Sequence, residues 1–254
     1  MSDNGTLPYR RAGAGVPLVL VHGYLGGSAQ WAQEMAHFSS RFDVIAPDLP
    51  GFGDAVDLPA LDRIGAMADA VIRLLDQLGI DRFVLLGHSM GGMIVQEIAA
   101  KIGERITHLI LYGTGPLGLM PDRFEPIALS KQRLSADGVA TTARRISATW
   151  FCRGEAAPGF GVVAAIGARA SEEAALAGLE AMTHWDGRNA LVTLTMPTLV
   201  IWGDSDKSYR WPQVESLWKA LPNAQLSVMP GAAHAAHLEK PHLFHAVLED
   251  FLKD

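Results

Sequence analysis

The stretch that most constrains the fold is 83–92, where an apolar run leads into a serine set between glycines and a helical pattern begins at once. This order predicts a strand, a sharp turn and a helix, with Gly-x-Ser-x-Gly at 87–91 forming the turn. The glycines fit because side chains there would collide with the neighbouring strand and helix. Ser89 would then be exposed at a helix N-terminus, where backbone N–H groups favour negative charge. We therefore expect Ser89 to be a nucleophile and the N–H of Met90 to stabilise an oxyanion, the alternative being a bystander serine in a glycine-rich turn.

Short apolar runs alternate with helical patterns on both sides of this turn. Such alternation predicts parallel strands joined by right-handed crossovers, in a sheet covered by helices on both faces. The expected strands are 16–21, 43–47, 83–86, 106–112, 197–202 and 224–229. The expected helices are 29–40, 61–78, 94–102, 211–220 and 241–252.

The pattern changes between 115 and 190, where no strong strand run occurs. Helical stretches around 123–134, 138–151 and 171–184 are separated there by breaks that contain glycine or proline. We interpret 115–190 as a helical insertion into an α/β core formed by 1–114 and 191–254. A single domain of this kind is ordinary for 254 residues, of which 49% are hydrophobic.

Charge and composition exclude several classes of partner. The formal net charge is −6 and no long basic block is present, so we expect no nucleic acid partner. No apolar stretch reaches the ~18 residues that a membrane span needs, and the first residues do not resemble a signal peptide. We expect a cytoplasmic protein that binds no membrane. Cys152 is the only cysteine, which excludes an internal disulfide.

Three chemically suitable groups follow strands of the predicted sheet. Ser89 follows one strand, the aspartates Asp204 and Asp206 follow another, and the histidines His234 and His237 follow the last. A serine hydroxyl is a weak nucleophile until a base removes its proton, and imidazole is suited to do so at neutral pH. A carboxylate can orient and stabilise that imidazole, so the three groups together predict nucleophilic catalysis.

The motifs of this chain resemble, over nearly its whole length, those of the α/β-hydrolase fold superfamily and its lid-bearing serine hydrolases, which include carboxylesterases, enol-lactonases and C–C hydrolases. They are His-Gly at 22–23, Asp-Leu-Pro-Gly-Phe-Gly at 48–53, Gly-His-Ser-Met-Gly-Gly at 87–92, Trp-Gly-Asp-Ser-Asp at 202–206, and His234 followed by Glu-Lys-Pro at 239–241. The resemblance implies an α/β fold with a mostly parallel central sheet flanked by helices and a helical lid after the sixth core strand. It also implies that Ser89 is the nucleophile, Asp206 the acid, His234 the base, and that the N–H groups of Tyr24 and Met90 form the oxyanion hole.

Rival interpretations exist for several of these side chains. Asp204 is the alternative acid and His237 the alternative base. A metal site built from His234, His237, His242 and His245 is disfavoured, because no cysteine or tight ligand set accompanies the histidines. We expect no metal and no cofactor.

Other residues are candidates for the substrate pocket. His22 and His88 adjoin the expected site, although bonding to nearby loop backbone explains each more simply. The tentative pocket consists of His22, Trp150, Phe151 and Trp185, with core packing as the alternative for the aromatic residues. The arginines Arg144, Arg145 and Arg153 could bind a substrate carboxylate or could lie on a solvated helix face.

We expect a hydrolase of a small carboxylic ester or lactone that works through an acyl-enzyme, as a monomer or homodimer. The resemblance also implies alternatives: C–C hydrolysis of meta-cleavage products, C–N hydrolysis of amides, or binding and signalling of a small molecule. C–C hydrolases of the superfamily usually carry a tryptophan directly after the catalytic histidine, where this chain has Ala235. That departure favours C–O cleavage.

Overall fold

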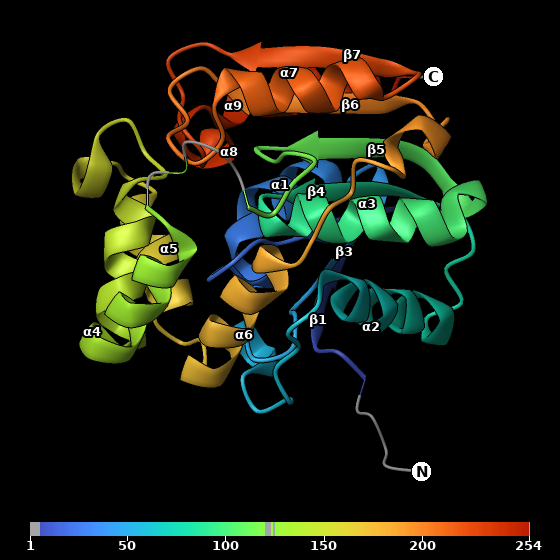
Figure 1. Cartoon of the computed structure of the whole chain (residues 1–254). Helices are drawn as coiled ribbons and strands as arrows, with labels where there is room; N and C mark the ends of the chain where they lie inside the picture. The colour runs from blue at the N-terminus through green and yellow to red at the C-terminus, as the bar shows by residue number, and fades with distance from the viewer. Residues whose placement is uncertain (1–5, 120–122, 124, 254) are drawn as a thin grey trace.

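The computed structural model describes residues 6–119, 123 and 125–253, and within them seven strands form one sheet (Figure 1). Their order is β1-β3-β2-β4-β5-β6-β7, with β1 antiparallel to β3 and all other neighbours parallel. The predicted mostly parallel sheet is therefore confirmed. The strands are β1 (Tyr9–Ala12), β2 (Val16–Val21), β3 (Phe42–Pro47), β4 (Phe83–His88), β5 (Ile106–Tyr112), β6 (Thr198–Gly203) and β7 (Ala224–Met229).

Helices cover both faces of this sheet. In β2, Leu18 and Leu20 pack into one apolar cluster while Val19 and Val21 pack into another, because successive side chains of a strand point to opposite faces. Both faces of the sheet are buried, which explains why the strand sequences are continuous apolar runs. The first cluster is completed by α1 (Ala32–Phe38) and α9 (Pro241–Phe251), and the second by α2 (Ile64–Gln77), α3 (Met90–Ile102) and α7 (Trp211–Ala220).

A helical insertion connects β5 to β6, inside the expected segment 115–190. It consists of α4 (Ile127–Ala148), α5 (Phe160–Gly167) and α6 (Glu172–Thr183), which lie beyond the end of the sheet to which the parallel strands point (Figure 1). Helix α4 is kinked at Gly138, whose φ of 78° is left-handed, where the sequence indicated a break between two helical stretches. In chain order the insertion follows β5, the fifth described strand, whereas the resemblance implied a sixth strand before it. Only β1 precedes the first predicted strand, β2, in the described part of the chain. The role of the insertion as a lid stays a prediction.

The parallel strands bring four loops to the same edge of the sheet. The loops after β2, β4, β6 and β7 all leave the carboxyl ends of their strands, which is where sites form in sheets of this type. The loop after β7 ends in the short helix α8 (Ala236–Glu239). No helix in the described part of the chain is long and apolar enough to cross a membrane.

Candidate active site

Ser89 occupies the sharp turn between β4 and α3, with φ 58° and ψ −122°. A non-glycine residue in this left-handed region costs on the order of 1–3 kcal/mol, so the surroundings must hold it there. The N–H of Ser89 donates to the carbonyl of Tyr112 (3.0 Å), and its own carbonyl accepts from the N–H of Gly92 (2.8 Å) and the hydroxyl of Thr114 (2.9 Å). Ser89 is half-buried, whereas His88 and Met90 on either side of it are buried, so the serine is the most accessible of the three.

The glycines of the turn are required by close backbone contacts, as the sequence predicted. A Cβ on Gly87 would lie 2.3 Å from the carbonyl oxygen of Gly91, and one on Gly91 would lie 2.4 Å from that of Val21. The loop after β2 presses against the same turn. A Cβ on Gly23 would lie 2.8 Å from the Cβ of Ser89, which places the backbone next to Tyr24 close to the serine.

A buried hydrogen bond joins the loops after β6 and β7. The Nδ1–H of His234 donates to Oδ2 of Asp206 at 2.8 Å, and the two residues are 1% and 2% exposed. The other carboxylate oxygen accepts the N–H groups of Ser208 (2.7 Å) and Tyr209 (3.2 Å). Both oxygens of Asp206 are thus held. Because the proton on Nδ1 is committed to Asp206, Nε2 of the neutral ring can act as a base.

The two alternative residues have other partners. Asp204 is exposed, and its Oδ1 accepts the N–H of Gly231 (2.8 Å) and the hydroxyl of Ser205 (3.1 Å), which is the pattern of a turn residue. The Nδ1 of His237 lies 3.0 Å from the hydroxyl of Tyr112. Of the two possible acids and two possible bases, the structure pairs Asp206 with His234.

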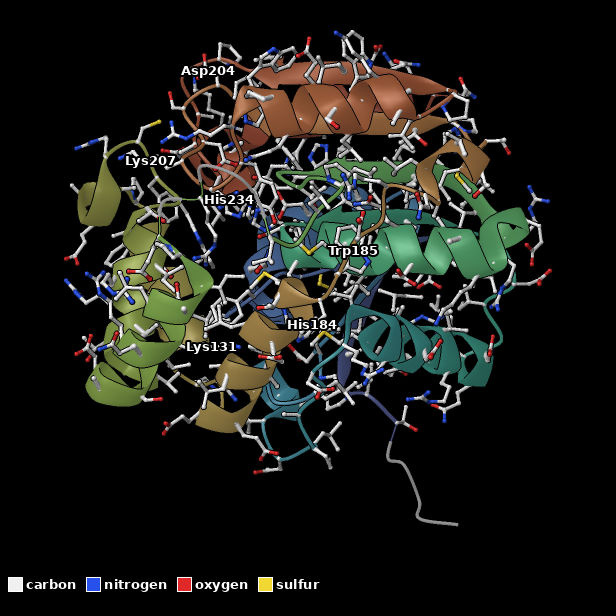
Figure 2. The ribbon with its side chains drawn as sticks, in the orientation of Figure 1. Lys131, His184, Trp185, Asp204, Lys207 and His234 are labelled. Carbon is white, nitrogen blue, oxygen red and sulfur yellow. The ribbon has the colours of Figure 1, made fainter. Side chains whose placement is uncertain are left out.

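Two aromatic residues link His234 to the serine turn. His88, directly before Ser89, donates from Nε2 to the carbonyl of His234 at 3.0 Å. The Tyr209 ring stacks on the His234 ring, with centroids 5.6 Å apart and 12° between the planes, and its phenol interacts with the hydroxyls of Ser89 and Thr114. Figure 2 shows His234 at the edge of the sheet that faces the helical insertion.

Tyr209 is a site residue that sequence reasoning missed. Burial raises the pKa of its phenol, which therefore stays protonated and can donate a hydrogen bond beside Ser89. The only signal in the sequence is its place three residues after Asp206, in the loop whose backbone holds that carboxylate.

His22 joins two loops through both of its ring nitrogens. Its Nδ1 donates to the carbonyl of Gly23 (2.8 Å), and its Nε2 accepts the N–H of Leu49 (3.0 Å). Burial lowers the pKa of this histidine. These contacts agree with the interpretation of His22 as a residue that bonds loop backbone, and they leave neither nitrogen for a substrate.

The aromatic residues expected in the pocket lie in different surroundings. The ring centroid of Trp150 is 5.8 Å from that of His234, so this residue borders the site. Phe151 is 1% exposed and packs next to Gly159, as a core residue does. The indole N–H of Trp185 donates to Glu97 of α3 at 2.9 Å, and Figure 2 shows this residue beside that helix. Trp150 is thus the one with a described contact to the expected base.

Comparison with known proteins identifies the family. A model of the alpha/beta hydrolase fold matches residues 16–241. The chain belongs to the α/β-hydrolase fold family. It is 30% identical to the candidate carbamate hydrolase RutD of Pseudomonas savastanoi pv. phaseolicola, over 94% of this chain and 95% of that protein.

Two further α/β-hydrolases are similar over nearly the whole chain. The pimeloyl-[acyl-carrier protein] methyl ester esterase of Legionella pneumophila is 29% identical, with 95% of this chain and 97% of that protein covered. A thermophilic esterase from Thermogutta terrifontis superposes with a TM-score of 0.88 at 27% identity, covering 97% of this chain and 93% of that one. Together these matches support an enzyme that hydrolyses esters.

Of the four histidines considered for a metal site in this α/β-hydrolase, three have separate partners, and His242 is exposed. His234 bonds Asp206, His237 bonds Tyr112, and Nε2 of His245 lies 3.3 Å from Glu34. Within the described residues, no three side chains of the kinds that bind metals are grouped closely enough to hold an ion.

His237 should make the stability of this α/β-hydrolase depend on pH. Burial lowers its pKa from 6.5 to about 4, so the unfolded chain binds a proton more readily than the folded one. The free energy of unfolding should therefore fall as pH drops from ~6.5 to ~4, by roughly 3 kcal/mol from this residue. Urea unfolding of wild type and His237→Gln at pH 7.0, 5.5 and 4.5 tests this. The variant should lose less stability over that range, and an equal loss in both proteins would contradict the assignment.

Proposed function

We propose that this α/β-hydrolase cleaves a small carboxylic ester or lactone through an acyl-enzyme, with Ser89, His234 and Asp206 as its catalytic triad and no cofactor. The observation that carries the proposal is the buried His234–Asp206 pair at 2.8 Å beside a serine in a strained turn. A buried imidazole with one nitrogen fixed by a carboxylate has the tautomer that a general base needs.

In the first half of the reaction, Oγ of Ser89 attacks the carbonyl carbon while Nε2 of His234 takes the hydroxyl proton. Asp206 stabilises the imidazolium. The carbonyl oxygen becomes an oxyanion, which accepts from the N–H groups of Met90 and Tyr24. Contact between Gly23 and Ser89 supports this arrangement, because it brings the loop of Tyr24 against the turn.

In the second half, His234 returns its proton to the leaving alcohol as the C–O bond breaks, and the acyl group stays on Ser89. For a lactone, the alcohol remains part of the acyl group. A water molecule then attacks the acyl carbon and gives a proton to His234, which passes it to Ser89 as the acid departs. We also propose that α4, α5 and α6 act as the lid over this site, since Trp150 comes from the segment just after α4.

C–O and C–N bonds are the two candidates for the bond that is cleaved. Relatives named for esters support C–O cleavage, and a relative named for carbamates suggests that a C–N bond is a second candidate. Ala235 alone is weaker support than the sequence implied, because Trp150 lies beside His234 and could replace a tryptophan at that position.

A panel of substrates separates these chemistries. We expect kcat/KM for short-chain esters and lactones to exceed that for a vinylogous 1,5-diketone by ~100-fold or more, since an ester needs only proton return to its leaving group and no prior ketonisation. Methyl carbamates and simple amides complete the panel, and Ser89→Ala gives the background. A ~100-fold preference for the diketone would replace ester hydrolysis by C–C hydrolysis, and a preference for carbamates would favour the second candidate.

A further inference from the structure

The arginines of the helical insertion differ in their surroundings. Arg144 has a side chain that is 61% exposed and is paired with Glu155. Arg153 is exposed. Arg145, the next residue on α4, has a side chain only 29% exposed, and its Nη1 donates to Glu125 at 2.9 Å. Only Arg145 of these three combines partial burial with a fixed orientation.

One edge of the Arg145 guanidinium has no partner among the described residues. Its Nε and Nη2 are buried and make no hydrogen bond with any described residue. Buried polar atoms are almost always bonded, so two orphaned donors on a charged group indicate a ligand. The same edge binds carboxylates elsewhere in this chain: Nε and Nη2 of Arg11 reach Asp43 at 2.8 and 2.6 Å, and those of Arg188 reach Asp186 at 2.9 and 2.6 Å.

A second residue with an orphaned donor lies in the loop beside Ser89. The Tyr24 hydroxyl is buried and has no partner among the residues that the structure describes. Gly167 of α5 lies between this loop and α4, because a Cβ on it would lie 2.9 Å from the carbonyl oxygen of Leu25 and 3.0 Å from the Cβ of Ala143. Burial raises the pKa of the Tyr24 phenol, and the charge of Arg145 opposes that rise. A Cβ on Gly178 of α6 would lie 3.0 Å from Cδ2 of Tyr24, and α6 packs against α4, so the loop of Tyr24 and the helix of Arg145 meet at α6.

The side chains around these donors carry more positive than negative charge. The carboxylate of Glu125 pairs with both Arg133 and Arg145, so a single negative charge faces two positive ones. Arg123 donates to the backbone carbonyl of Glu125 and to the hydroxyl of Ser130. The charge of Arg123 also acts on Tyr24 and on Tyr209, and Tyr209 contacts Ser89. The positive charge of these arginines favours an anionic ligand.

We propose that the Nε–Nη2 edge of Arg145 and the hydroxyl of Tyr24 bind a carboxylate of the substrate, so that the enzyme prefers esters or lactones that carry a second, free carboxylate. Monoesters of short dicarboxylic acids are the simplest such compounds. This inference rests on the proposed function, because it assigns the part of the substrate that does not react. A planar carboxylate fits the fork of Arg145 in two parallel hydrogen bonds, and an uncharged ester leaves that fork unpaired.

Matched substrates test the charge alone. Monomethyl succinate, glutarate and adipate are each compared with the methyl ester whose free carboxylate is replaced by a primary amide of the same shape. Wild type should prefer the carboxylate by at least ~10-fold in kcat/KM for one chain length, and Arg145→Gln should lower that preference by about 10–100-fold. Arg144→Gln, one residue away on the same helix, should leave the preference within ~3-fold of wild type. No preference in wild type, or the same preference in Arg145→Gln, would overturn the proposal.

Further variants keep the test valid if Arg145→Gln fails to fold. Arg145→Lys keeps the charge that faces Glu125 but loses the fork, and Tyr24→Phe removes only a hydroxyl that has no described partner. Each should lower the preference for the carboxylate by ~3-fold or more, with Tm within a few degrees of wild type. An unchanged preference in both variants would contradict the inference.

Calorimetry separates this inference from the proposed function. Succinate, glutarate and adipate are titrated into Ser89→Ala and into Ser89→Ala with Arg145→Gln. Binding to the first protein and ~10-fold weaker binding to the second would support the carboxylate site even if no ester is cleaved, in which case only the proposed function fails. Ester cleavage that depends on Ser89, without any Arg145-dependent binding or preference, would overturn the carboxylate site alone.

Discussion

Replacement of Ser89 by alanine should lower kcat for ester hydrolysis by at least ~10⁴-fold, because the members of a triad act as a unit and the remaining rate comes only from binding and the oxyanion hole. The change removes one oxygen from a half-buried side chain, so folding should be unaffected. Steady-state kinetics with a nitrophenyl ester and an unfolding curve measure both quantities.

Ser205→Ala is the matched control for this loss. Ser205 is exposed in the loop of Asp204, and its hydroxyl donates to that carboxylate at 3.1 Å. Turnover by this variant should stay within ~2-fold of wild type, as for other exposed surface positions. A Ser89→Ala enzyme that retains a tenth of wild-type kcat would show that another group is the nucleophile.

Asp206→Asn should lower kcat by roughly 10³–10⁴-fold, whereas Asp204→Asn should change it by less than ~3-fold. The buried carboxylate of Asp206 accepts the Nδ1–H of His234, and an amide there would favour the wrong tautomer and would not stabilise the imidazolium. Asp204 bonds only Gly231 and Ser205 on the exposed side of the loop. The pair of variants is compared at the same pH with the same ester. A larger defect in Asp204→Asn would reverse the assignment of the acid.

Much of this site could be predicted because the residues that the serine turn requires for steric reasons lie beside the residue that carries the chemistry. The turn at Ser89 requires Gly87 and Gly91, so residues close to the serine in the sequence are enough to predict its geometry. The pairing of Asp206 with His234 was reached through resemblance and register. Chemistry alone left Asp204 and His237 open, because their hydrogen bonds depend on how two loops meet.

Elements without a periodic signal were missed. β1 is a short edge strand whose residues are mostly exposed, so it lacks the apolar run of a buried strand. α5 spans Phe160–Gly167 and is apolar on nearly every side, so no helical period distinguishes it. The sequence indicated a break between the helical stretches 138–151 and 171–184, where the structure has α5, and it indicated no strand before 16, where the structure has β1.

Contacts formed only by the tertiary fold could not be predicted either. Trp150 and Trp185 look equivalent in the sequence, yet one borders His234 and the other donates to Glu97. Arg144 and Arg145 are adjacent and of the same type, yet a turn of 100° around the helix axis makes one exposed and the other half-buried. Such differences are set by the packing of α4 against the core.

The most direct test of the central claim is covalent labelling by a nitrophenyl alkylphosphonate, which a triad serine attacks as it would an ester. The account predicts release of one nitrophenol per chain, a mass increase of one phosphonyl group, and that group on the peptide that contains Ser89. Ser89→Ala should not be labelled, and Asp206→Asn should be labelled far more slowly than wild type. A phosphonyl group on another residue, or equal labelling of wild type and Ser89→Ala, would contradict the assignment of Ser89 as the nucleophile.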